Sequence, residues 1–144
     1  MMMPGRFPHE NPRDSMDEFG RNKLHYAANN GVSMTVKTLI DHGINIDSQD
    51  NNGWTALHFA SQNNHFDTIA LLLENNANPN IHDKQGNGPL WTAAMHANGK
   101  CDGVALLLKA NADPNHKNHH GRTPHYIANF LKNGLVETFK SCIK

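Results

Sequence analysis

Residues 51–80 read NNGWTALHFASQNNHFDTIALLLENNANPN, and this stretch decides the fold. It opens with turn residues, among which Gly53 is free to adopt a positive φ. Thr55 follows at an N-cap position, where its hydroxyl can accept a hydrogen bond from the backbone amides near His58. These features predict a turn and then a short helix that directs Leu57 inward.

A second helix follows the break at Asn-Asn-His. Its apolar residues recur at spacings of three and four, which is typical of one buried helical face. Asn76 suits a left-handed C-terminal cap, and Pro79 prevents the helix from continuing. The residues predicted to form the buried face are Phe66, Ile69, Leu72 and Leu73.

The same pattern occurs four times. Gly20, Gly53, Gly86 and Gly121 are separated by 33, 33 and 35 residues, and each opens a similar turn and helix. A fixed period of this size predicts stacked units, each of which needs its neighbours to bury an apolar face. We assign a flexible N-terminal tail to residues 1–16 and a repeat domain to 17–144. The units are 17–49, 50–82, 83–117 and, as a C-terminal cap, 118–144.

The repeated motif resembles the ankyrin repeat. GWTALHFA and GRTPHYIA, which begin at Gly53 and Gly121, stand where that family writes Thr-Pro-Leu-His-x-Ala. The segments LLLENNANPN and LLLKANADPN match its second-helix ending. The resemblance implies an all-α solenoid of about four helix-turn-helix repeats joined by β-turn or hairpin loops. It also implies recognition of other proteins through the turn tips and the exposed side of the first helices.

Several units depart from the motif. Asn22 replaces the capping threonine of the first unit, from which we expect a weaker cap. The third unit has Gly88 for the threonine, Trp91 for the histidine, and two extra residues within MHANGKCDG. The fourth has His125 at an inward position and a second helix with a weak apolar pattern, LVETFKSCIK. A polar residue on the last layer is what a terminal capping unit requires.

Composition narrows the class of protein. The chain has 144 residues and no net charge, but its charges are unevenly distributed. Residues 17–82 carry three basic and seven acidic side chains, whereas residues 83–144 carry eight basic and four acidic ones. Neither half is basic enough to indicate nucleic-acid binding. Without a secretion signal, a membrane span or a cysteine framework, we expect a cytoplasmic protein that is monomeric when free.

Positions that vary between units while the frame stays fixed are candidates for partner binding. Trp54 and Phe19 stand out because large apolar groups on turns are typical of binding hot spots. The alternative for both residues is that the ring folds back over the adjacent unit and serves packing. For Trp91, by contrast, packing is the favoured role. If Trp54 serves binding, its truncation should leave stability nearly unchanged. The full candidate set is Phe19, Arg21, Asn51, Asn52, Trp54, Lys84, Gln85, Asn87, Trp91, Met95, His96, His119, His120 and Arg122.

Asparagine-glycine dipeptides occur five times. We interpret them as turn residues, because asparagine and glycine both tolerate a left-handed backbone. They begin at Asn30, Asn52, Asn87, Asn98 and Asn133.

Neither catalysis nor a cofactor is indicated. The chain lacks a phosphate-binding loop, a nucleophile elbow and a suitable carboxylate pair. His116, His119 and His120 cluster in sequence near His125, but they lack the spacing of zinc ligands, so we expect no metal. We interpret Cys101 as a small apolar residue at a helix start in preference to a reactive thiol.

The third and fourth units also resemble short bacterial ankyrin proteins that serve as immunity partners of secreted polymorphic toxins. The resemblance is carried by Pro-Leu-Trp at 89–91, by the two-residue insertion, and by the Asn-His-His-Gly turn at 118–121. It implies an immunity protein that covers the active site of a toxin domain. The alternatives are a general scaffold or adaptor and, from another class, a metal- or redox-active protein.

Overall fold

A computed structural model describes residues 15–131 of the chain, and within this range it contains seven helices and no β-strand. The helices are α1 (Lys23–Asn30), α2 (Ser33–Asp41), α3 (Ala56–Gln62), α4 (Phe66–Glu74), α5 (Pro89–Met95), α6 (Asp102–Lys109) and α7 (Pro124–Leu131). The second helix expected in the last unit, Cys142 and most of the tail assigned to 1–16 lie outside the described residues.

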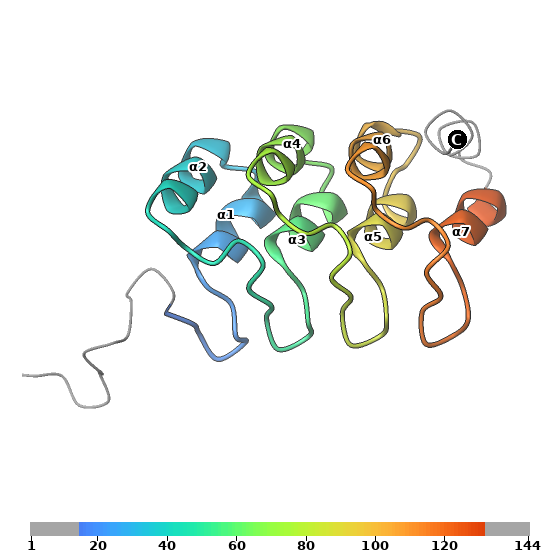
Figure 1. Cartoon of the computed structure of the whole chain (residues 1–144), viewed down its shortest axis with the longest axis horizontal. Coiled ribbons are helices and arrows are strands. Elements are labelled where there is room, and N and C mark those ends of the chain that lie inside the picture. The colour runs from blue at the N-terminus through green and yellow to red at the C-terminus, as the bar shows by residue number, and fades with distance from the viewer. Residues whose placement is uncertain (1–14, 132–144) are drawn as a thin grey trace, which may run out of the picture.

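The helices stand in two rows (Figure 1). The first helices of successive units, α1, α3, α5 and α7, contact one another in order along one row, which we call the inner row. The second helices α2, α4 and α6 form the other row, the outer row, and each packs on the first helix of its own unit. Long hairpin loops extend from the inner row on the side away from the outer helices. This arrangement confirms the prediction of an all-α repeat solenoid.

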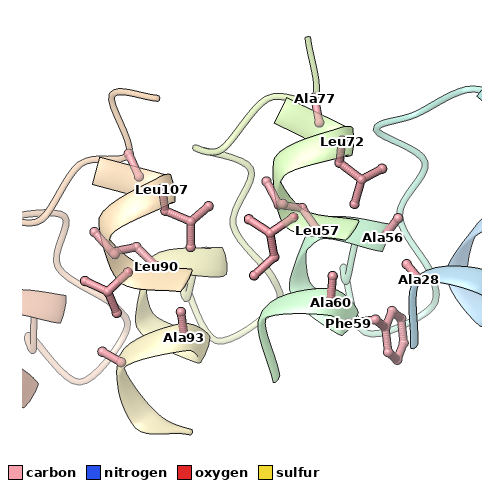
Figure 2. Packing of buried hydrophobic residues seen from close by; sticks show 14 of the residues in the cluster. Ala28, Ala56, Leu57, Phe59, Ala60, Leu72, Ala77, Leu90, Ala93 and Leu107 are labelled. Atoms are coloured by element: carbon pink, nitrogen blue, oxygen red, sulfur yellow. The ribbon is translucent and has the colours of Figure 1, made fainter. Parts of the chain in front are cut away.

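The core lies between the rows and between the units. Ile69 and Leu72 of α4 are completely buried, as the spacing of the second-helix residues predicts. Figure 2 shows Leu57 and Leu72 of the second unit in the same relative places as Leu90 and Leu107 of the third. Full burial of an aliphatic side chain of this size contributes about 1.5–3 kcal/mol. Because the helices of each unit pack against those of the next, the apolar side chains are buried at the interfaces between units, and these interfaces stabilise the stack.

The N-cap predicted at Thr55 is present. Its hydroxyl accepts a hydrogen bond from the His58 backbone amide at 3.4 Å, and the Thr55 amide donates to His58 Nδ1 at 3.0 Å. The two residues form a reciprocal capping box at the start of α3. The predicted positive φ values also occur, 81° at Gly53 in the hairpin turn and 69° at Asn76 after the end of α4.

The weaker cap expected at Asn22 is not seen. Asn22 Oδ1 accepts the His25 backbone amide at 3.1 Å, and the Asn22 amide donates to His25 Nδ1 at 3.0 Å. This is the same capping box as in the second unit, built with an amide oxygen in place of a hydroxyl. Asparagine ranks with serine and aspartate among the best N-cap residues, so its presence does not weaken the helix.

The hairpin loops share one hydrogen-bonded turn. Asp50 Oδ1 accepts the backbone amides of Asn52 and Trp54, both at 2.9 Å. Residues Asp17, Asp83 and Asn118 do the same in the other hairpins. One backbone hydrogen bond joins each hairpin to the next: Asn51 to Phe19, Lys84 to Asn52, and His119 to Gln85. The hairpin tips are therefore held side by side at fixed spacing.

Candidate functional site

A groove of about 490 Å³ lies where three consecutive hairpins meet the inner row of helices. The hairpins contribute Arg21, Asp50, Asn52, Trp54, Asp83, Lys84, Gln85 and Asn87. The inner helices and the residue that follows α5 contribute Phe59, Gln62, Trp91, Thr92, Met95 and His96. We call this surface the inner groove.

The inner groove brings together nine of the fourteen candidate residues from the sequence. They are Arg21, Asn52, Trp54, Lys84, Gln85, Asn87, Trp91, Met95 and His96. The remaining five, Phe19, Asn51, His119, His120 and Arg122, do not line it. A role in partner binding stays a prediction for both sets.

The five outlying residues belong to the first two and the last hairpins. Phe19 is 51% exposed and lies beneath the Arg21 guanidinium, 5.1 Å from its carbon. Asn51 bridges hairpins, because its Nδ2 donates to the Glu18 carbonyl at 3.0 Å. His119 and His120 are exposed on the fourth hairpin, where the Arg122 guanidinium lies over the Tyr126 ring.

An aromatic cluster forms part of the groove wall. The Trp54 ring stacks on His58 with centroids 5.4 Å apart and meets Phe59 edge-on at 5.0 Å. Its Nε1 donates to Asp83 Oδ2 at 3.0 Å, a hydrogen bond that reaches into the next unit. Trp54 therefore folds back on the adjacent hairpin and still lines the groove.

These contacts favour the packing alternative, in which truncation of Trp54 lowers stability. The ring contributes packing within its own unit and a hydrogen bond to the next. Aromatic pairs of this geometry contribute about 0.5–1.5 kcal/mol beyond the area they bury. Trp54 therefore has a packing role, and its role in partner binding stays a prediction.

The carboxylates of the groove are engaged within the protein. Asp50 Oδ2 accepts from Arg21 Nε at 3.2 Å, and its side chain is 1% exposed. Asp83 uses one oxygen for its own turn and the other for Trp54 Nε1. The Arg21 guanidinium also lies over the Phe59 ring, with 5.2 Å from its carbon to the centroid. Neither carboxylate is therefore left without a partner inside the protein.

Several polar side chains of the groove have no hydrogen-bond partner within the described residues. Among residues 15–131, the Lys84 ammonium and the side-chain amides of Asn52, Gln62 and Gln85 make no hydrogen bond or ion pair. Lys84, Asn52 and Gln85 are exposed, and Gln62 is half-buried. The groove therefore offers a lysine and several amides beside an apolar wall.

Two buried histidines lie behind the groove. His58 Nε2 donates to the Asn87 carbonyl at 3.0 Å, and His25 Nε2 lies 2.8 Å from the Ser48 carbonyl. Burial lowers the pKa of His58 to about 4, and burial also lowers the pKa of His25. Both imidazoles are therefore neutral at physiological pH.

Five groove residues lie outside the candidate set from the sequence: Asp50, Phe59, Gln62, Asp83 and Thr92. The two aspartates accept backbone amides within their own turns, so their residue type indicates a turn and not a binding site. Phe59 and Thr92 occupy the position after the motif histidine, where the other units have Tyr26 and Ile127. The residue at this position differs between units, and this variation could have identified it as a candidate for partner binding.

The histidine-rich fourth hairpin does not converge on a metal site. Within residues 15–131, no group of three or more His, Cys, Asp or Glu side chains is placed to hold a metal ion. His116 instead stacks on His82, with ring centroids 3.5 Å apart. Cys101 is half-buried against the core at the start of α6.

No helix in the described part of the chain has the length and apolar character needed to cross a membrane.

Comparison with known families agrees with this geometry. A family model described as ankyrin repeats (3 copies) matches residues 6–83, and a model of the single ankyrin repeat matches 85–119. No curated protein matches the chain. The first match alone covers more than half of the sequence. The chain therefore belongs to the ankyrin-repeat family.

Proposed function

We propose that this chain acts by binding another protein in the inner groove, without catalysing a reaction. The observation that carries the proposal is the convergence of three hairpins and two inner helices on one open surface of about 490 Å³. Ankyrin repeats are protein-binding modules, and proteins built from them are generally non-catalytic scaffolds. Rigid units held at fixed spacing present such a surface with little loss of entropy on binding.

The partner segment is expected to carry an apolar anchor flanked by acidic or carbonyl groups. Met95 is 42% exposed, and together with the Trp54 and Trp91 rings it gives the groove an apolar wall. Lys84 and the unengaged amides supply donors, whereas Asp50 and Asp83 are engaged internally. A partner carboxylate would therefore find free donors and no unpaired carboxylate in the groove to repel it.

The more specific role that we propose is that of an immunity protein. It is supported by the sequence likeness of the third and fourth units to short immunity partners of polymorphic toxins. In this role the groove, or the insertion between α5 and α6, covers the active site of a toxin domain and blocks its substrate. The mechanism is stoichiometric, so inhibition should be complete at one immunity protein per toxin. A general scaffold would bind its partner without inhibiting any enzyme.

Affinity capture with paired variants tests the binding surface. The groove variant combines Lys84→Glu with Met95→Glu. The control combines Lys109→Glu on α6 with Met34→Glu on α2, because Lys109 and Met34 are exposed on the outer row. We expect the groove variant to lose a partner that both the wild-type protein and the control retain. Retention by the groove variant, with circular dichroism confirming that it is folded, would contradict the proposal.

Toxin protection tests the finer role. Cells that express a toxin encoded beside the gene for this chain should survive when the wild-type protein is co-expressed and die with the groove variant. The purified toxin should lose activity in proportion to added immunity protein. A captured partner that keeps full activity when saturated would favour the scaffold and exclude immunity.

A further inference from the structure

Four of the five Asn-Gly dipeptides lie in the described residues, and the fold holds them differently. This sequence is chemically labile, because the glycine nitrogen can attack Cγ of the asparagine without hindrance from a side chain. The attack requires a free glycine nitrogen and a side-chain amide that can rotate toward it. The local structure therefore decides which dipeptide reacts.

Two of the dipeptides have a glycine nitrogen that is already engaged. The Gly31 amide ends α1 by donating to Ala28 at 3.2 Å. The Gly53 amide donates to the Asp50 carbonyl at 2.9 Å, and a Cβ on Gly53 would lie 2.9 Å from the Asp83 backbone. Both glycines are fixed against neighbouring structure, so neither nitrogen can reach the preceding side chain without local opening.

The third dipeptide is protected on its asparagine. Asn87 is 9% exposed, and its Oδ1 accepts from Asn118 Nδ2 at 2.9 Å. The Asn87 backbone is also held, because its amide donates to Asp83 Oδ1 and its carbonyl accepts from His58 Nε2. The side-chain amide cannot turn toward Gly88 without breaking a buried hydrogen bond.

Asn98 and Gly99 have none of these restraints. Both are exposed in the loop between α5 and α6, with φ values of 50° and 83°. Within residues 15–131, the Asn98 side chain and the Gly99 amide make no hydrogen bond. Apart from residues 98–100 themselves, no described residue has an atom within 4 Å of the place where a Gly99 Cβ would be. The reacting groups are therefore free and open to water.

We propose that Asn98 is a site of spontaneous deamidation and isomerisation. The Gly99 nitrogen forms a bond to Cγ of Asn98, the Cγ–Nδ2 bond breaks, and the proton from Gly99 leaves with the amide nitrogen as ammonia. Water then opens the resulting succinimide at one carbonyl or the other. The products are aspartate and isoaspartate at position 98, and no oxidant or reductant is needed.

The modification changes the edge of the inner groove. Met95 and His96 line the groove immediately before the loop, and the His96 carbonyl accepts from Asn64 Nδ2 at 2.9 Å. Either product adds a negative charge beside Lys100. Isoaspartate also adds a methylene group to the main chain, which shifts the residues between Asn98 and α6. Modified protein is therefore a distinct form in charge and in loop geometry.

Time-resolved peptide mapping tests the proposal. Asn133→Gln first removes the fifth dipeptide, which lies outside the described residues. The folded protein is incubated in mildly alkaline buffer and digested at acidic pH, and deamidation is followed by mass spectrometry. We expect Asn98 to convert at least about tenfold faster than Asn30, Asn52 or Asn87, a factor equal to about 1.4 kcal/mol of local opening at the other sites.

A parallel incubation in urea separates the effect of the fold from that of sequence. All four dipeptides should then convert at similar rates, because each has the same glycine neighbour. The Asn98→Gln variant should lose the early acidic form on ion exchange. Equal rates in the folded protein, earlier conversion of Asn30, Asn52 or Asn87, or a preference for Asn98 that persists in urea would overturn the proposal.

Discussion

His58 joins the second unit to the third, because its Nε2 donates to the Asn87 carbonyl at 3.0 Å while its Nδ1 accepts the Thr55 amide at 3.0 Å. Only the neutral imidazole with its proton on Nε2 can make both bonds. His25 repeats the relationship one unit earlier, toward the carbonyls of Ser48 and Trp54. A single side chain thus caps its own helix and holds the next hairpin.

Acidification should destabilise the protein through these histidines. Burial lowers the pKa of folded His58 to about 4, against 6.5 in the unfolded chain. The unfolded state therefore binds more protons between these values, and stability is full above pH 6.5 and falls as pH decreases toward 4. For His58 the complete loss is about 3 kcal/mol, and the lowered pKa of His25 acts in the same direction.

Urea unfolding at about pH 7.5 and 5.5 measures the part of this loss that occurs while most carboxylates stay ionised. The His58→Gln variant is the control, since it is less stable at both values but lacks the titrating group. The difference between the two pH values should be smaller for this variant than for the wild-type protein. A wild-type protein that gained stability on acidification would contradict the account.

Replacement of Asn22 tests the revised view of the first cap. Asn22→Ala removes the acceptor for the His25 amide and should cost about 0.5–2 kcal/mol. Asn22→Thr should be nearly neutral, because it restores the residue that the second unit uses. Thermal unfolding of the wild-type protein and the two variants shows whether Asn22 is a weak or a strong N-cap. If alanine were tolerated as well as threonine, the hydrogen bond would contribute nothing.

The indole hydrogen bond of Trp54 can be tested against a matched control. Trp54→Phe keeps a ring but removes the donor to Asp83 Oδ2, and should cost about 1–3 kcal/mol because the acceptor is charged. Trp91 lines the same groove, yet its indole nitrogen makes no hydrogen bond within residues 15–131. Trp91→Phe should therefore cost less in chemical unfolding. The reverse order would show that the Asp83 bond does not stabilise the stack.

Truncation in the core tests the register of the second unit. Leu72 is completely buried, so Leu72→Ala should cost about 2–5 kcal/mol through lost burial and the cavity left behind. Leu71, on the same helix, is only partly buried, and Leu71→Ala should cost clearly less. Equal losses in urea unfolding would mean that α4 presents a different face to the core.

The repeat frame could be predicted from sequence because each of its parts is local. The cap at Thr55, the left-handed Asn76 and the buried Leu72 follow from residue chemistry and helical spacing, and the structure confirms them. The period of about 33 residues then implies the stacking. The wrong expectation at Asn22 arose from comparison with the family motif, although asparagine is itself a strong N-cap residue.

The groove was only partly predictable, because it is formed by units that are distant in sequence. Variation between units identified hairpin positions such as Lys84 and Gln85. It could not show that the Trp54 indole reaches Asp83 of the next hairpin, which depends on how two units dock. Nor could it separate Asn98 from the other Asn-Gly dipeptides, since the difference lies in hydrogen bonds and exposure.

Hydrogen exchange on the purified complex tests the central claim most directly. Backbone amides are compared in the free protein and in the protein bound to its captured partner. If the inner groove binds the partner, slower exchange should appear in the second and third hairpins and at the end of α5. The outer helices α2, α4 and α6 should exchange as in the free protein. Protection confined to those outer helices would contradict the account.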